Sequence, residues 1–113
     1  MSKLSMTGAG EVSAIADMLQ REITESAMSC ELVERADRFA PEMKAILLVF
    51  DKYYMRTDNR TSLSVMVSGG GGVVNVDAAG SGGGQGALFR FNWGAEEDFV
   101  DVVRDILSRR GFS

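Results

Sequence analysis

The sequence predicts a two-layer α+β domain in which an antiparallel meander sheet of four to six strands carries two helices on one face. Two segments space their apolar residues with the period of a helix, and most of the chain between them alternates with the period of a strand. The predicted order is strand, helix, four or five strands, helix. Because the 113 residues show no repeat and no linker, we expect a single domain, residues 1–113.

The first predicted elements are a short strand and an amphipathic helix. Residues 3–7 alternate between apolar and polar side chains, and the glycines that follow break this pattern. From Glu11 to about Ser26 the period becomes helical, and Glu11 in the first turn suits the positive end of the helix dipole. The stripe that we expect to be buried consists of Val12, Ile15, Ala16, Leu19 and Ile23.

A second strand is predicted from Ala27, where the period returns to two. The pattern does not define where this strand ends, because the charged segment 34–39 follows it directly. Pro41 indicates a turn before the next element. Its apolar side would carry Met28, Cys30 and Leu32.

Residues 42–55 fit a helix or a strand, because apolar residues recur at helical spacing within them. Against the helix, residues 45–50 are apolar without interruption, and the valine and aromatic residues favour a strand. We favour a long strand inside the sheet. Since it is apolar on both sides, its second face would need cover.

The chain is organised around residues 62–93, where two glycine-rich segments separate alternating apolar residues. If Gly70-Gly71 forms a two-residue hairpin turn, the apolar residues of both flanking strands share one face. The predicted partners are Val67 with Val74, Val65 with Val76, and Leu63 with Ala78.

A four-residue connection at residues 81–84 would add a further strand to this meander. That strand would pair Ala78 with Ala87, Val76 with Phe89 and Val74 with Phe91, and it would place Asp77 diagonal to Arg90 on the outer face. A final helix follows, with acidic residues 96–98 in its first turn and Gly111 as its C-terminal cap. Its apolar stripe is Phe99, Val102, Val103, Ile106 and Leu107.

The composition excludes several kinds of function. The net charge of −4 and the scattered basic residues argue against nucleic acid as a partner. No apolar run approaches the length of a membrane span, so we expect no membrane partner and a cytoplasmic location. The chain has no histidine and one cysteine, which excludes catalysis by a serine–histidine or cysteine–histidine pair and an internal disulfide.

The glycines also allow a second hypothesis, a phosphate cradle. Residues 82–87 match the loose glycine fingerprint of dinucleotide-binding loops, but that motif must open a helix, and here it opens a predicted strand. The acidic residues 96–98 at the next helix start would repel phosphate. We therefore favour sheet turns over an anion site.

No residue of this chain is predicted to be catalytic or to bind a metal, and no cofactor is expected. Cys30 is expected to be a buried, inert thiol because no basic residue adjoins it in the sequence. The candidate ligand or interface contacts are Asp77, Arg90, Gln85, Trp93 and Tyr54.

Residues 81–103, SGGGQGALFRFNWGAEEDFVDVV, resemble a family of small bacterial proteins, domain of unknown function family 6054. The upstream residues 60–67 resemble the preceding strand of that family. The chain departs from the family in its longer glycine runs, in Gly86 and in Trp93. The resemblance implies no activity. The matching positions are Gly82, Gly83, Gln85, Ala87, Phe89, Asn92, Gly94, Glu96, Glu97 and Phe99.

Three functions remain open, in order of preference. The first is a non-enzymatic domain that self-associates, as a homodimer, through the sheet face that the helices leave uncovered. The second is a small-molecule binder with a pocket between sheet and helices. An enzyme comes last, because no nucleophile is paired with a base.

Overall fold

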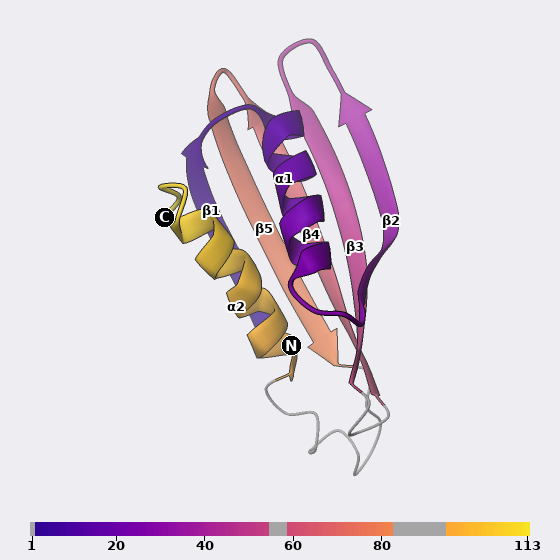
Figure 1. The fold of residues 1–113 in the computed structure, drawn as a ribbon. Coiled ribbons are helices and arrows are strands. Elements are labelled where there is room, and N and C mark those ends of the chain that lie inside the picture. The colour runs from indigo at the N-terminus through magenta and orange to yellow at the C-terminus, as the bar shows by residue number, and fades with distance from the viewer. Residues whose placement is uncertain (1, 55–58, 83–94) are drawn as a thin grey trace.

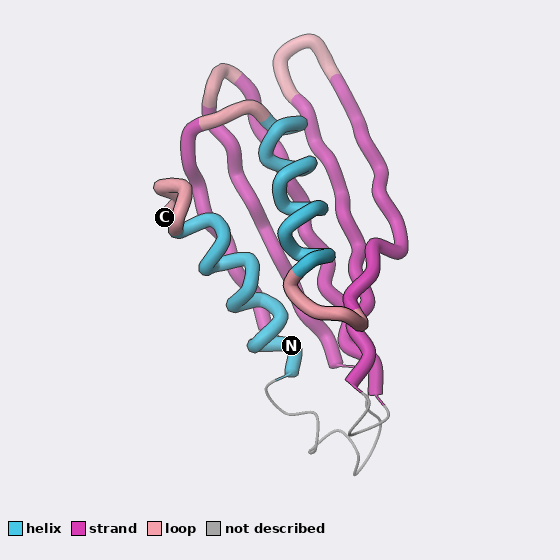
Figure 2. The backbone as a smooth tube through the Cα atoms, in the orientation of Figure 1, coloured by secondary structure: helices cyan, strands magenta, loops and turns pink. Residues whose placement is uncertain are grey.

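The computed structural model describes residues 2–54, 59–82 and 95–113, which form one antiparallel sheet and two helices. The sheet order is β1-β5-β4-β3-β2, so β2 to β5 form a meander and β1 joins it beside β5. Both helices lie on the same side of the sheet (Figures 1 and 2). This confirms the predicted two-layer α+β fold. The elements are β1 (Ser2–Ala9), α1 (Val12–Glu25), β2 (Cys30–Phe39), β3 (Lys44–Tyr54), β4 (Asn59–Gly70), β5 (Val73–Gly82) and α2 (Ala95–Ser108).

The core is the layer between the sheet and the two helices. Helix α1 packs over β2, β3 and β4, whereas α2 packs over β1, β4 and β5, and the two helices contact each other. The predicted inner-face residues of β4 and β5 are all buried, as are most residues of the two predicted helical stripes. The largest fully buried side chains include Leu19, Ile23, Ile46, Leu48, Phe50, Leu63, Phe99 and Leu107.

Strand β2 is longer than predicted. It begins at Cys30 and continues through the charged segment to Phe39, with a bulge between Leu32 and Glu34 that makes Val33 an extra residue. Met28 precedes the strand and is fully exposed, so its predicted place on the apolar face is wrong. The predicted turn at Pro41 is confirmed, because Ala40 and Met43 exchange backbone hydrogen bonds across it.

Residues 44–54 are confirmed as a strand inside the sheet, between β2 and β4. The helix side of β3 is fully buried at Ile46, Leu48 and Phe50. On the other side, Leu47 is exposed, and Ala45 and Val49 are half-buried. Among the described residues no helix covers this second face.

The turn between β4 and β5 lies at Gly71-Gly72, one residue later than predicted. Both glycines have the positive φ angles of a type I′ turn, +63° and +86°. Val67 therefore pairs with Val76 and Val65 with Ala78, so the predicted register was wrong by two residues on one strand. A shift of two residues keeps every side chain on its own face, and for this reason the predicted buried face is still correct.

The predicted pairing of β5 with residues 87–91 is also wrong. Strand β5 lies between β4 and β1, and Leu4, Met6 and Gly8 take the positions opposite Ala78, Val76 and Val74. Local sequence patterns do not show this pairing, because about seventy residues separate the two strands. Residues 83–94 themselves lie outside the described part of the chain.

The C-terminus covers the free edge of β1 at Thr7. Gly111, with φ of +85°, ends α2 as predicted, and Phe112 N–H donates to Leu107 O at 3.1 Å. Phe112 is buried beside Gly8, where any larger residue would overlap its ring. Ser113 then exchanges two backbone hydrogen bonds with Thr7, at 2.9 and 3.0 Å.

Candidate functional site

The structure describes two of the five predicted contact residues and does not bring them together. Asp77 lies in the middle of β5, on the face away from the helices. Tyr54 is the last residue of β3 and pairs with Asn59 at the far end of the sheet. Gln85, Arg90 and Trp93 lie outside the described residues. A binding role for any of the five stays a prediction.

Asp77 has a polar neighbour that the sequence did not indicate. Because Ser5 of β1 lies opposite it, the Ser5 hydroxyl donates a hydrogen bond of 2.7 Å to Asp77 Oδ1. Thr7 makes the corresponding bond of 2.8 Å to Asn75 Oδ1, two positions along the same strands. The expected pairing of Asp77 with Arg90 involves a residue outside the described part of the chain.

The open face of the sheet is the side opposite the two helices, and no helix of the described residues covers it. Its side chains form rows of cross-strand neighbours, since antiparallel pairing places opposite residues on the same side. The central row crosses all five strands and changes from apolar to polar along its length. It consists of Ala36, Leu47, Met66, Asp77 and Ser5.

Exposed apolar side chains are part of this face. Leu47 is 39% exposed, and Met66, directly opposite it, is 43% exposed. Val73 is 50% exposed at the start of β5. Small side chains surround Leu47 and Met66, among them Ala36, Ala45, Ser64 and Ser68, so a second flat surface can approach this pair closely. Charged side chains, among them Lys3, Asp51 and Asp77, also belong to the face.

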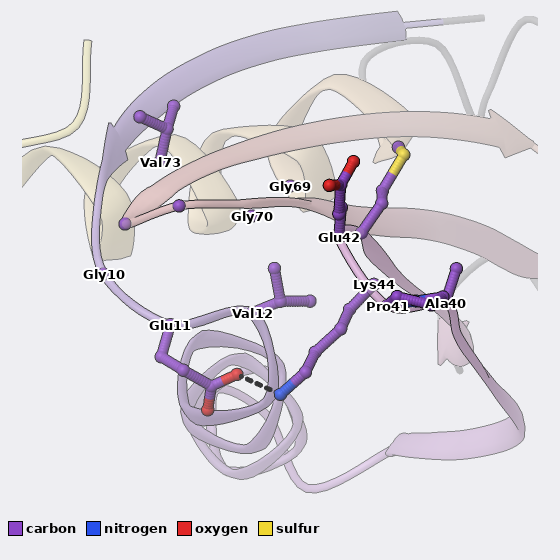
Figure 3. A pocket seen from close by; sticks show the side chains of 13 residues that line it. Gly10, Glu11, Val12, Ala40, Pro41, Glu42, Lys44, Gly69, Gly70 and Val73 are labelled. Carbon is purple, nitrogen blue, oxygen red and sulfur yellow. Dashed lines mark hydrogen bonds and ion pairs between the residues drawn. The ribbon is translucent and has the colours of Figure 1, made fainter.

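A cleft of about 420 Å³ lies at the glycine end of the molecule. Three segments that are distant in sequence form it: the entry to α1, the β2–β3 turn and the β4–β5 turn (Figure 3). Its walls are mostly glycine backbone and apolar side chains, with three charged residues at its rim. The lining residues are Gly10, Glu11, Val12, Ala40, Pro41, Glu42, Met43, Lys44, Gly69, Gly70, Gly71, Gly72 and Val73.

Glu11 accepts hydrogen bonds from two backbone N–H groups at the start of α1. It is the N-cap residue, and its carboxylate accepts from Ser13 N at 2.9 Å and from Ala14 N at 3.2 Å. Lys44 Nζ lies 3.0 Å from the same carboxylate (Figure 3). These bonds, first the one from Ser13 N–H and then the one from Lys44, lower the pKa of Glu11 below its ordinary value of 4.5. The helix start therefore already holds a negative charge, which disfavours an anionic ligand there.

Two glycines of the cleft are required by close backbone contacts. A Cβ atom at Gly70 would overlap the carbonyl oxygen of Glu42, and one at Gly69 would overlap that of Val73. Gly69 also has a φ of +149°, which side chains disfavour. The glycine run thus lets the two turns approach each other, in addition to forming one of them.

The described residues also bear on two other kinds of site, a metal centre and a reactive thiol. They contain no group of acidic, histidine or cysteine side chains that could hold a metal ion. Cys30 is buried, and burial raises the pKa of its thiol above 9.0. No helix within the described ranges is long and apolar enough to cross a membrane.

Sequence patterns did not reveal the cleft or the charged edge strand. Gly10, Pro41 and Gly71 each indicated a turn, but only the strand order shows that these three turns lie at the same end of the sheet. The charges of residues 34–39 were interpreted as the end of a strand. Their alternation in sign, glutamate and arginine followed by aspartate and arginine, was the signal that they form part of one.

Comparison with known proteins gives a family and no activity. The family model described as a family of unknown function, DUF6054, matches residues 1–111. No curated protein matches the chain.

Proposed function

The chain belongs to the DUF6054 family of unknown function, and we propose that it is a non-enzymatic domain that self-associates through the open face of its sheet. The observation that supports this proposal is the pair Leu47 and Met66, two exposed apolar side chains opposite each other at the centre of that face. A second copy packed on this face would remove both from water.

The dimensions of the face suit such an interface. Strands spaced about 4.8 Å apart, with about 3.3 Å per residue, give five strands of eight to twelve residues a face of roughly 24 by 30 Å. This corresponds to roughly 700 Å² per copy, close to the ~800 Å² per partner of a stable protein interface. Small side chains around the central pair allow the usual spacing of about 10 Å between packed sheets.

The experiment is sedimentation equilibrium of the wild-type chain and of Met66→Lys. Because two copies related by a twofold axis bury the same residues, one substitution places two charges in the interface, and desolvating them is costly. We expect at least a tenfold weaker association for Met66→Lys. Lys3→Gln, at the rim of the same face, is the matched control and should associate like the wild type. Equal association of Met66→Lys and wild type would contradict the proposal.

A second candidate function, binding of a small molecule, is favoured by the cleft at the glycine turn. Its volume of about 420 Å³ lies within the range of small-molecule sites. The cleft lies at the end of the sheet, whereas the layer between sheet and helices, where such a pocket was expected, is filled with buried side chains.

The probe for this second candidate is the uncharged fluorescent dye N-phenyl-1-naphthylamine. Ala40→Trp would fill the cleft from an exposed turn position and should abolish dye binding. Met28→Trp places the same ring outside the cleft and should leave dye binding unchanged. If both variants bind the dye like the wild type, the cleft is not a ligand site.

A further inference from the structure

Strand β2 is an open edge with an unusual order of charges. Within the described part of the chain its only hydrogen-bonded strand neighbour is β3, so its other edge carries backbone groups without a strand partner. Residues 34–38 read Glu, Arg, Ala, Asp, Arg. When a second copy of this segment runs antiparallel to the first and is centred on Ala36, each charged residue lies opposite a residue of the opposite charge.

We propose that β2 pairs with β2 of a second copy of this chain, antiparallel and centred on Ala36, to form a continuous ten-stranded sheet. In this register Glu34 lies opposite Arg38 of the second copy, and Arg35 lies opposite Asp37 of the second copy. Ala36 lies opposite its own copy. Four cross-strand pairs of opposite charge then surround the twofold axis.

The directions of the side chains agree with this register. Glu34, Ala36 and Arg38 pair with Val49, Leu47 and Ala45, whose side chains lie on the open face. Arg35 and Asp37 pair with the buried residues Leu48 and Ile46, and therefore lie on the helix side. Each proposed pair thus joins two side chains on the same side of the sheet, as antiparallel pairing requires.

Two hydrogen bonds indicate which backbone groups face the open edge. Arg35 N–H donates to Glu34 Oε1 at 3.0 Å, and the Asp37 carbonyl accepts from Arg38 Nη1 at 2.9 Å. In the proposed register the Arg35 N–H of one copy donates to the Asp37 carbonyl of the other copy. Glu34 and Arg38, which now bond to them, are then free to pair with each other between the two copies.

Alternative symmetric registers are unfavourable. A charged residue lies opposite its own copy if the pair is centred on Glu34, Arg35, Asp37 or Arg38. Like charges directly opposite each other destabilise a strand pair. Charged residues on an edge usually prevent pairing for this reason. Here the same charges select one register, because only Ala36 is uncharged within the segment 34–38.

On the helix side of β2, the carboxylate of Asp37 has acceptor capacity for the second copy. Arg35 donates to both carboxylate oxygens of Asp37, at 2.9 and 3.1 Å, and to Asp17 and Gln20 of α1, at 2.8 and 2.7 Å. A carboxylate offers about four lone pairs, so Asp37 can accept a second arginine. At the ends of the pairing, Val33 and Phe39, 55% and 62% exposed, come opposite each other.

The other edge of the sheet differs in a way that supports this choice. Strand β1 is covered at Thr7 by its two backbone bonds to Ser113. The edge can be tested apart from the open face in the proposed function, although Glu34, Ala36 and Arg38 of β2 lie on the same side of the sheet as Met66. Met66 lies on β4, two strands away from β2, so Met66→Lys alters the open face and leaves the edge strand unchanged.

Cysteine cross-linking tests the register. Ala36→Cys places a thiol opposite its own copy within disulfide reach, and we expect oxidation to give a covalent dimer that thiol reductants separate. Glu34→Cys, which lies opposite Arg38 of the second copy, is the matched control and should remain a single chain. Buried Cys30 is present in both variants. A single chain for Ala36→Cys, or equal cross-linking of Glu34→Cys, would overturn the proposal.

Charge reversal tests the interface without a cysteine, in the Met66→Lys background that removes the open-face contact. Glu34→Arg should weaken the remaining dimer at least about tenfold, because it creates two pairs of like charge. Adding Arg38→Glu to the same chain restores opposite charges and should restore the dimer. Arg109→Glu, on an exposed site after α2, is the control. The edge proposal is wrong if the Met66→Lys chain is a monomer, or if Glu34→Arg leaves its dimer unchanged.

Discussion

Lys44 Nζ lies 3.0 Å from Glu11 Oε2 and so joins the first residue of β3 to the residue that caps α1. The same carboxylate binds two backbone N–H groups of the helix. One side chain thus fixes the start of α1 and ties it to the sheet beside the cleft. This arrangement, the glycine turn and the closed C-terminus each lead to a prediction about stability.

Glu11→Ala should lower the urea midpoint of unfolding more than Lys44→Ala does. The glutamate substitution leaves two N–H groups at the start of α1 without their acceptor, whereas the lysine substitution removes one exposed ion pair, which contributes little. Urea titration of both variants at pH 7 measures the difference. A larger loss for Lys44→Ala would show that the ion pair, and not the cap, is important.

Stability should fall in acid through Glu11 and Asp37. Both carboxylates have folded-state pKa values below their ordinary values of 4.5 and 3.8, Glu11 through its bond from Ser13 N–H and Asp37 through its bond from Arg35. A lowered folded pKa stabilises the fold above the unfolded pKa, and this contribution is lost as the pH falls through the folded pKa. Thermal unfolding of wild type and of the Glu11→Gln, Asp37→Asn double variant between neutral pH and pH 3 should show a flatter acid limb for the variant. Parallel profiles would contradict this prediction.

The glycines of the β4–β5 turn should differ in their tolerance of substitution. Gly71-Gly72→Asn-Gly should preserve the free energy of unfolding, because asparagine tolerates the positive φ of a type I′ turn and no atom lies within 4 Å of either added Cβ position. Gly70→Ala should lose about 1–3 kcal/mol, since its Cβ overlaps the Glu42 carbonyl. Denaturant titration of both variants measures their free energies of unfolding. Similar losses would contradict the assigned turn position.

Phe112 should contribute more to stability than its place next to the C-terminus suggests. It is buried against Gly8, and large-to-small substitutions of buried phenylalanine cost about 3–5 kcal/mol. Phe112→Ala should therefore approach this loss in a denaturant titration. Met28→Ala, at a fully exposed position, is the control and should stay within about 0.5 kcal/mol of wild type. A loss below 1 kcal/mol for Phe112→Ala, as expected of a frayed end, would contradict the closed C-terminus.

Cys30 should react slowly with a thiol reagent in the folded protein. The residue is buried, and burial raises its pKa, so little thiolate is present at pH 8. Reaction with a chromogenic disulfide reagent should become fast only in denaturant. Fast reaction without denaturant would show an accessible thiol.

Periodicity predicted the faces of the elements well because it depends on neighbouring residues. The buried residues of α1, β4 and β5 follow directly from spacings of 3.6 and two, and the type of residues 42–55 was decided by the β-favouring side chains. The register of the glycine hairpin could not be decided in the same way. Four consecutive glycines allow several turn positions. Moving the turn by one residue shifts the strand register by two residues, and this shift keeps all side chains on the same face. The choice is made by the close contact of Gly70 with Glu42, a residue of another turn.

Contacts between segments that are distant in the sequence could not be predicted, for a different reason. The place of β1 beside β5 depends on the packing of α2 and on Ser113, which bonds to Thr7 at the end of the chain. The cleft has the same origin, since its three walls come from residues 10–12, 40–44 and 69–73. No local pattern shows which turns share one end of a sheet. The charge order of residues 34–38 could be read directly from the sequence, but its meaning depends on the open edge.

Light scattering of the wild-type chain at tens of micromolar tests the central claim, self-association, most directly. We expect a mass of at least twice the 12.2 kDa of one chain. We further expect that this mass decreases in the Met66→Lys variant, which loses the open-face contact. A mass of one chain at these concentrations would contradict both the open-face and the edge-strand interfaces.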